Sequence, residues 1–208
     1  MKALILVDLQ NDFGNFGALA LKEANEVIAI ANQLMHTGFF DLVIASRYWQ
    51  PADHKIFAAN HFFRYPNQLV DIDGHSERLW SIHCVQDSFG ASFIDALELA
   101  PIDKIVSKRA DKDNFSYSCF FPPKINEKSE LLTYLKASKV EDVFLLGFMT
   151  EFGIKESALD AQKFGFRTHL IKDACRAANL DSPKDGANSL ELLQTAGITL
   201  LDSDQLML

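Results

Sequence analysis

A carboxylate at the end of the first apolar segment is the residue best placed for chemistry. Residues 3–7 form an uninterrupted apolar run, and Asp8 follows it directly. A strand that is apolar on both faces is typical of a parallel sheet covered by helices. Ligands of open α/β sheets bind at the carboxyl ends of the strands, so Asp8 lies where a catalytic group is expected. Because Asp also favours turns, a role in capping the next turn is equally supported by position alone.

Histidine and cysteine side chains supply a second set of candidates. Residues 47–90 show no sustained periodicity and contain His54, His61, His75 and His83. So long an aperiodic segment predicts a functional loop region. The spacings of these residues match no metal-ligand pattern, and we interpret them as ordinary loop histidines. The three cysteines also lack such spacing, and their odd number predicts reduced thiols: Cys84, Cys119 and Cys175.

Alternating strands and helices are expected to position these residues. Apolar residues at helical spacing predict one helix over 24–35, and further helices are predicted at 91–98, 129–135, 154–161 and 187–196. After the first strand, others are predicted at 42–45, 105–107, 143–147, 167–171 and 198–201. This order predicts a single α/β domain over residues 1–208. Its architecture would be a three-layer αβα sandwich around a six-stranded, mainly parallel sheet.

Composition and charge narrow the class of partner. The chain has 208 residues, of which 48% are hydrophobic, and a formal net charge of -8. This length is enough for one sizeable core. The lack of a basic cluster argues against nucleic acid or an anionic membrane as partner. No run of about 18 apolar residues and no signal-peptide pattern occurs, so we expect a cytoplasmic protein that binds a small molecule.

Six segments in a fixed order carry a family resemblance. They are ALILVDLQNDF at 3–13, PADH at 51–54, WSIHCVQ at 80–86, SYS at 116–118, LLGFMTEFGIKESALDA at 145–161 and KDACRA at 172–177. Together they resemble the nicotinamidase/pyrazinamidase branch of the isochorismatase-like hydrolases, over nearly the whole chain. The resemblance implies an isochorismatase-like fold. It also implies hydrolysis of nicotinamide to nicotinate and ammonia by an Asp, a Lys and a nucleophilic Cys beside a metal ion.

Two of the implied catalytic residues are retained. Asp8 matches the family Asp, which is expected to take a proton from the nucleophile and pass it to the leaving amine. Lys108 matches the family Lys, just after the third strand. A cation facing Asp8 would hold the carboxylate ionised and stabilise developing negative charge. Lysines are usually solvated, but the match to the family motif favours a pocket role for Lys108.

The implied nucleophile is missing. In the family, the strand that corresponds to residues 143–147 leads into a turn whose Cys opens the next helix, where the helix N-terminus favours the thiolate. Here the turn is Met-Thr-Glu-Phe-Gly, and Gly153 occupies the position of the cysteine. A glycine has no atom with which to form an acyl-enzyme. Thioester chemistry at this position is therefore excluded.

The implied metal site is also altered. Tyr48 and Gln50 stand where the family supplies an Asp and a His, while His83 is retained and His54 lies nearby. Tyr and neutral Gln are poor replacements for a carboxylate and an imidazole around a transition metal. We therefore expect no cofactor, with a zinc, manganese or iron ion doubtful. The family metal holds the pyridine nitrogen of nicotinamide. The changes therefore impair both the binding of nicotinamide and the nucleophilic attack on its amide.

Other residues are placed around the pocket by the same resemblance. Phe13, Trp49 and Tyr117 match lining positions. Met149 and Thr150 match a turn in which the family has a cis peptide, so a cis bond between them would indicate that the pocket architecture is kept. Cys119 borders the pocket in this alignment and could serve as a relocated nucleophile. We interpret it, like Cys84 and Cys175, chiefly as a small apolar core residue.

Three functions follow from these observations. The first is a nicotinamidase-like protein that lacks ordinary nicotinamidase activity and binds a small molecule near Lys108. The second is an isochorismatase-type hydrolase that uses Asp8 as general acid with Lys108, without a covalent intermediate; an active amidase that uses Cys119 is a variant of the enzymatic hypothesis. The third is an interaction role through the aromatic loop at 57–65. The resemblance also implies a homo-oligomer, either a dimer or a tetramer.

Overall fold

A parallel sheet of six strands forms the centre of the molecule, in the order β5-β2-β1-β6-β7-β8. The computed structural model describes residues 1–121 and 129–207. The strands are β1 (Lys2–Val7), β2 (Leu42–Tyr48), β5 (Lys104–Lys108), β6 (Asp142–Phe148), β7 (Arg167–Arg176) and β8 (Thr199–Leu201). The parallel arrangement confirms the fold class predicted from the sequence.

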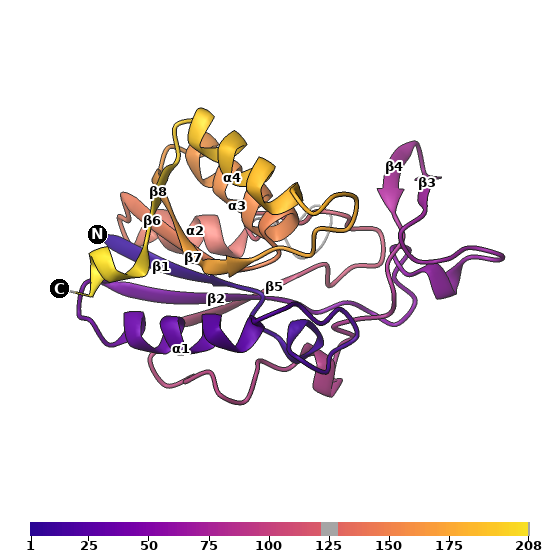
Figure 1. Ribbon diagram of the computed structural model, residues 1–208, viewed down its shortest axis with the longest axis horizontal. Coiled ribbons are helices and arrows are strands. Elements are labelled where there is room, and N and C mark those ends of the chain that lie inside the picture. Colours follow the sequence, from indigo (N-terminus) through magenta and orange to yellow (C-terminus); the bar gives the residue numbers. More distant parts are fainter. Residues whose placement is uncertain (122–128, 208) are drawn as a thin grey trace.

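Helices cover both faces of this sheet, as the alternating pattern predicted. α1 (Ala24–Met35) lies on one face, and α2 (Glu130–Ala137), α3 (Lys155–Lys163) and α4 (Asp185–Thr195) lie on the other (Figure 1). Leu4 and Leu6 of β1 pack in the α1 core, whereas Ile5 and Val7 pack in the opposite core. β1 is therefore buried on both faces. Among the residues described, no helix is long and apolar enough to cross a membrane.

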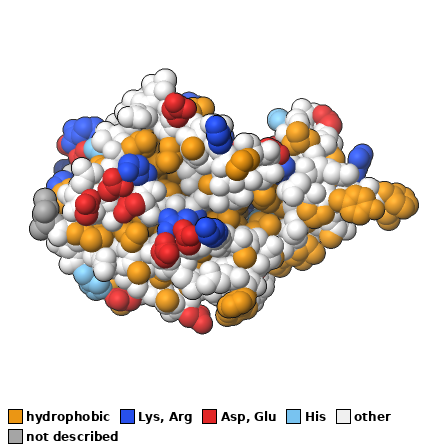
Figure 2. Space-filling model, viewed as in Figure 1, with side chains coloured by type: hydrophobic (Ala, Val, Ile, Leu, Met, Phe, Trp, Pro, Cys, Tyr) orange, Lys and Arg blue, Asp and Glu red, His pale blue; other side chains and the backbone are white. Residues whose placement is uncertain are grey.

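A projecting arm lies between β2 and β5, in the region predicted to be a functional loop. It contains an antiparallel hairpin of β3 (Leu69–Ile72) and β4 (His75–Arg78) that extends away from the sheet (Figure 1). Its turn residues, Asp73 and Gly74, have positive φ angles of 52° and 86°, as expected of a two-residue hairpin loop. Figure 2 shows hydrophobic side chains at the tip of the arm. Phe62 and Phe63, which precede the hairpin in the sequence, are exposed.

The helix predicted at 91–98 is wrong. The structure has only a 3-10 helix at Phe89–Ala91, followed by turns and extended backbone. The backbone of this segment bonds to the loop after β1 instead, because Ile94 N donates to Leu9 O at 3.0 Å and Ser92 O accepts from Asn11 N at 2.9 Å. These tertiary hydrogen bonds satisfy the groups that a helix would have paired internally.

Candidate active site

Asp8 lies at the carboxyl edge of the sheet, immediately after β1. Its backbone has φ 58°, a left-handed conformation in which Asp is more common than most residues. Ser46 in the neighbouring β2 donates its hydroxyl to Asp8 Oδ1 at 3.0 Å. The side chain has no exposed surface. Its oxygens face side chains from other strands, so the structure supports a site residue over a simple turn cap.

Lys108 is the last residue of β5 and reaches the same point. Its Nζ lies 2.6 Å from Asp8 Oδ2 and donates to Tyr117 O at 2.8 Å. The ammonium group also lies 4.0 Å from the centre of the Tyr48 ring, within range of a cation–π interaction. Two strands that are far apart in the sequence thus bring one carboxylate and one ammonium group into contact in a buried site.

Burial and pairing act in opposite directions on Asp8. Burial favours the neutral carboxyl and raises the pKa of Asp8 above its usual value, while the Lys108 ammonium and the Ser46 hydroxyl lower it. Burial is the larger effect, so the pKa of Asp8 remains raised. A carboxyl whose pKa is raised holds its proton more readily than an exposed aspartate, as a general acid requires.

Gly153 lies directly beside this pair. It belongs to a π-helical turn, Thr150–Ile154, that leads into α3. A Cβ atom built at Gly153 would lie 3.1 Å from Asp8 Oδ2, 3.5 Å from Lys108 Nζ and 3.0 Å from Phe148 O. A side chain at this position would therefore touch both charged groups. Glycine leaves the carboxylate and ammonium groups without a third functional group at that point.

The turn before Gly153 contains a cis peptide bond, but one position earlier than expected. The bond is between Phe148 and Met149, not between Met149 and Thr150. Met149 and Thr150 are both buried, and Met149 O accepts hydrogen bonds from Phe152 N and Ile154 N, each at 3.1 Å. The expectation was therefore wrong in position, although the irregular turn is present.

The residues at the implied metal positions bond to one another. His83 Nδ1 lies 2.8 Å from Ser81 O, so this nitrogen carries the proton and Nε2 has the free lone pair. Gln50 Nε2 donates toward His83 Nε2 at 3.2 Å and to His83 O at 3.1 Å. The Tyr48 and His83 rings are 5.9 Å apart. The lone pair that would bind a metal is thus occupied by an amide N–H.

These residues do not fit a metal ion. His54 Nε2 contacts Asn114 O at 3.1 Å, and its Nδ1 accepts from Ile56 N at 3.0 Å, so both ring nitrogens are engaged. The Tyr48 hydroxyl and Gln50 Oε1 are buried without a partner among the described residues, but both groups are neutral. Within residues 1–121 and 129–207 no three His, Cys, Asp or Glu side chains are grouped so that they could hold a metal ion.

His54 and His83 remain neutral for a related reason. Burial, with a smaller effect of the Arg109 guanidinium, lowers the pKa of His54 to about 3 and that of His83 to about 4. His61 bonds to Lys55 O at 2.7 Å, and His75 is exposed on β4. None of the four therefore forms a histidine cluster within the part of the chain that the structure describes.

All three cysteines are buried free thiols. Cys119 packs with Phe120 and Ile154 in the core beneath α2 and α3, and burial raises the pKa of its thiol to about 12. The pKa of Cys175 is raised to about 12 and that of Cys84 also lies well above its usual value, again through burial. Such thiols are poor nucleophiles because the reactive form is the thiolate.

Aromatic side chains enclose the charged groups. Phe13 packs against Tyr48, His83 and Phe148, with ring centres about 6 Å apart. On the other side, Trp80 Nε1 donates to the Tyr117 hydroxyl at 3.1 Å. The ring of Phe152 lies 5.1 Å from that of Trp80. The guanidinium carbon of Arg47 lies 3.8 Å from the centre of the Trp49 ring.

Sequence reasoning missed Arg109 and Ser46. Arg109 follows Lys108 directly, has φ 53° and is 1% exposed. An arginine is rarely so buried, and its position next to Lys108 was the available signal. Ser46 looked like an ordinary residue of a buried strand, and only its partner across the sheet reveals its role.

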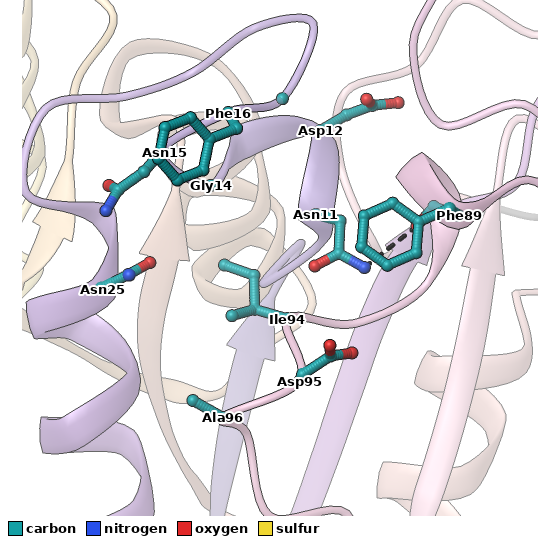
Figure 3. A pocket seen from close by; sticks show the side chains of 11 residues that line it. Asn11, Asp12, Gly14, Asn15, Phe16, Asn25, Phe89, Ile94, Asp95 and Ala96 are labelled. Atoms are coloured by element: carbon teal, nitrogen blue, oxygen red, sulfur yellow. Dashed lines mark hydrogen bonds between the residues drawn. The ribbon is translucent and has the colours of Figure 1, made fainter.

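Two surface pockets lie near the carboxyl edge of the sheet. One of about 450 Å³ has Trp80, Met149, Leu19 and Ala178 in its wall, with Lys22 as its charged residue. Another of about 350 Å³ is shown in Figure 3, where Phe16, Phe89 and Ile94 surround it. The first is closer to the candidate site, because Trp80 bonds to Tyr117, whose backbone carbonyl accepts from Lys108.

The fold and this site define a family. The chain matches the isochorismatase domain over residues 2–205, and it belongs to that family. Within the family its relatives are nicotinamidases. It is 35% identical to the nicotinamidase of Escherichia coli (strain K12) over 201 residues, which cover 96% of this chain and 93% of that protein.

Solved structures show the same branch. The nicotinamidase/pyrazinamidase of Acinetobacter baumanii has a TM-score of 0.90 at 33% identity and covers 99% of this chain and 97% of its own. The pyrazinamidase of Pyrococcus horikoshii, in complex with zinc, has a TM-score of 0.78 at 31% identity, with 97% and 98% covered. These likenesses confirm the resemblance and the isochorismatase-like α/β fold.

Proposed function

We propose that this chain is a nicotinamidase-like protein that binds a small molecule at the Asp8–Lys108 edge and does not hydrolyse nicotinamide through an acyl-enzyme. The observation that carries the proposal is the position of Gly153. A side chain there would contact both Asp8 and Lys108, and in this chain no nucleophilic atom stands at that point. Covalent amide hydrolysis needs such an atom beside its base.

No other described thiol can take over this role. Cys119 is the sulfur suggested by the resemblance, but it is 2% exposed in the core and burial raises its pKa to about 12. At neutral pH almost none of it is thiolate. These properties favour a structural role for Cys119 over that of a relocated nucleophile.

The metal-dependent half of the family reaction is also unsupported. The donors at Tyr48 and Gln50 are neutral, and His83 Nε2 accepts the Gln50 amide. A site of this composition offers a divalent ion no negative charge. We therefore propose that the function of this chain requires neither a metal ion nor another cofactor.

One observation favours a second candidate, an isochorismatase-type hydrolase. Burial raises the pKa of Asp8, so its carboxyl can hold a proton for transfer to a vinyl ether substrate. Lys108, 2.6 Å away, would stabilise the carboxylate that remains. This chemistry needs neither the missing cysteine nor a metal.

The deciding experiment is ammonia release from nicotinamide by the purified protein, with zinc, manganese or iron supplied and with chelator. We expect none above the uncatalysed rate, together with a shift in thermal midpoint when a ligand binds. Ammonia release that survives Cys119→Ser would overturn the proposal. Release abolished by Cys119→Ser would overturn it in favour of the relocated nucleophile. Cleavage of isochorismate lost in Asp8→Asn would favour the second candidate.

The setting and assembly of the protein are part of the same proposal. We propose a cytoplasmic location and a homo-oligomer, a dimer or tetramer, without a nucleic-acid or membrane partner. The net charge of -8 supports the exclusion of polyanionic partners. The exposed aromatic side chains Phe62 and Phe63 support an assembly that covers the tip of the arm. Solution mass measurement would test the assembly.

A further inference from the structure

Arg109 is a buried cation held at the centre of the candidate site. It follows β5 in a left-handed conformation and is 1% exposed. Its Nε donates to Ser116 O at 2.9 Å and its Nη2 to Phe115 O at 2.8 Å, next to the Tyr117 carbonyl that Lys108 uses. The backbone carbonyls of residues 115–117 therefore accept hydrogen bonds from Arg109 and Lys108, and these bonds fix the guanidinium group in place.

Arg109 has no direct ion pair among the described residues, and the carboxylates of Asp8 and Glu77 act on its charge only from beyond ion-pair distance. Arg78, Arg167 and Arg176 each contact an Asp or Glu side chain. Arg109 is more buried than any of them, yet it has no carboxylate within 4.0 Å among the described residues. Taking a cation out of water without a counter-charge is unfavourable. The guanidinium is partly stabilised by the rings of Tyr117 and Tyr48, at 4.3 and 5.1 Å.

The charges of the site therefore do not cancel. Asp8 and Lys108 form one buried pair, while Arg109 adds a second buried positive charge, and Glu77, the further carboxylate that acts on Arg109, is only partly buried. The hydrogen bonds of the two nearby histidines are those of neutral rings, since His83 Nε2 accepts the Gln50 amide and His54 Nδ1 accepts from Ile56 N. A site with one excess buried cation favours a ligand that carries one negative charge.

Arg109 also lies beside the implied metal positions. Its guanidinium carbon is 5.1 Å from the ring of Tyr48, and the ring of His83, which contacts Gln50, lies 5.9 Å from the ring of Tyr48. A divalent ion at this location would be repelled by the guanidinium at short range in a medium of low dielectric constant. The positive charge that a metal would supply is already present as a side chain.

We propose that Arg109 is the resident cation of this site, excludes a divalent metal ion, and makes the site select a ligand with a carboxylate group. The ligand class rests on the proposed function. The aromatic side chains around Arg109 extend to a surface pocket of about 450 Å³, whose wall includes Trp80. Trp80 bonds to Tyr117, and the ring of Tyr117 lies against Arg109.

Zinc titration tests the exclusion of metal. Two variants are compared. The first, Tyr48→Asp/Gln50→His, supplies two metal-binding side chains beside His83, and the second carries the same changes together with Arg109→Met. Competition with a chromophoric chelator measures zinc affinity, and circular dichroism checks that both variants fold. We expect at least 100-fold tighter zinc binding when Arg109 is replaced. Equal affinities in the two variants, whether strong or undetectable, would overturn the exclusion.

Calorimetry with a matched ligand pair tests the carboxylate preference. Nicotinate and nicotinamide share a ring and differ in the charge of one substituent. We expect the unmodified protein to bind nicotinate at least tenfold more tightly, Arg109→Met to lose that preference, and Arg109→Lys to keep part of it. Arg78→Met is the control, because Arg78 is already paired with Asp181, and it should keep the full preference.

The ligand inference fails if nicotinate binds no better than nicotinamide, including the case in which neither binds. It also fails if Arg109→Met keeps the preference. The proposed function is tested separately by ammonia release, so an active amidase whose nicotinate preference depends on Arg109 would overturn the function and support the inference. The reverse pattern, an inactive protein without the preference, would overturn the inference alone.

Discussion

Replacement of Lys108 by methionine is the sharpest test of the Asp8–Lys108 pair. Lys108 is 2% exposed and Asp8 is fully buried, with 2.6 Å between Nζ and Oδ2. Methionine keeps much of the volume but removes the charge, which leaves a buried carboxylate without its cation. Breaking a buried pair in this way costs about 3–5 kcal/mol. We expect a loss of this size in the free energy of unfolding at pH 8, measured by urea denaturation.

The same variant should show a characteristic pH dependence. Loss of Lys108 removes the largest effect that lowers the pKa of Asp8, so burial raises that pKa further above its usual value of 3.8. A carboxyl with a raised pKa binds its proton more tightly in the folded state. Its destabilising effect is therefore fully present above the folded-state pKa, decreases as the pH falls below that pKa, and is gone only below the unfolded value of 3.8. The deficit of Lys108→Met should shrink from pH 8 to pH 5.

Lys104→Met is the matched control on the same strand. Lys104 Nζ lies 2.6 Å from Glu130 Oε1, but both side chains are partly exposed, so the loss should be at most about 1 kcal/mol and insensitive to pH over this range. Lys108→Met/Asp8→Asn should recover most of the stability, because neither an unpaired carboxylate nor an unpaired ammonium group remains at these two positions. Equal losses in Lys108→Met and Lys104→Met, or an equal deficit at pH 5 and pH 8, would refute the reasoning.

Three further predictions concern the same edge of the sheet. Gly153→Cys alone should release no ammonia from nicotinamide, with or without zinc; turnover in a coupled assay would contradict this. Gly147 has φ 127°, and a Cβ atom there would lie 2.1 Å from Val7 O, so Gly147→Ala should lower the free energy of unfolding in urea by more than about 3 kcal/mol. The control Gly38→Ala, whose Cβ would meet open space, should lower it by about 1 kcal/mol. The pKa of His83 is about 4 in the folded state against its usual 6.5. The folded state is therefore more stable above pH 6.5 than below pH 4 by about 3 kcal/mol, and this stability is lost as the pH falls from 6.5 to 4. His83→Gln should flatten that slope, and an unchanged slope would count against it.

The parallel sheet could be predicted from the sequence because its signals are local. β1 is an apolar run on both faces, and α1 begins and ends where the helical spacing of apolar residues begins and ends. The hairpin of β3 and β4 was missed although its turn, Asp73-Gly74, is a recognised hairpin signal. β4 is polar, and β3 is only four residues long and largely exposed although it contains Leu69, Val70 and Ile72. Neither strand therefore shows the longer alternation of apolar and polar residues that marks a strand in a sequence.

The site was only partly predictable, since its chemistry depends on contacts across the sheet. The family motif pointed to Asp8 and Lys108, and the structure brings them together. Arg109 was missed because a buried arginine and a solvated one look alike in a sequence. Its burial comes from the loop that folds back over it, where Phe115 and Ser116 accept its hydrogen bonds. The helix predicted at 91–98 was wrong for a similar reason, because the backbone of this segment forms hydrogen bonds with Leu9 and Asn11 in place of helical ones.

The departures from the family pattern compensate one another. Without a metal, the lone pair of His83 Nε2 needs a donor, and the amide of Gln50 supplies it. Tyr48 presents its ring to Lys108 at 4.0 Å, so the face of an aromatic ring partly replaces the lost carboxylate. Arg109 would be repelled by a restored metal but is tolerated beside these neutral groups. Replacement of any one of these residues would therefore disturb its partners, and the zinc experiment separates their effects by changing Tyr48 and Gln50 with and without Arg109.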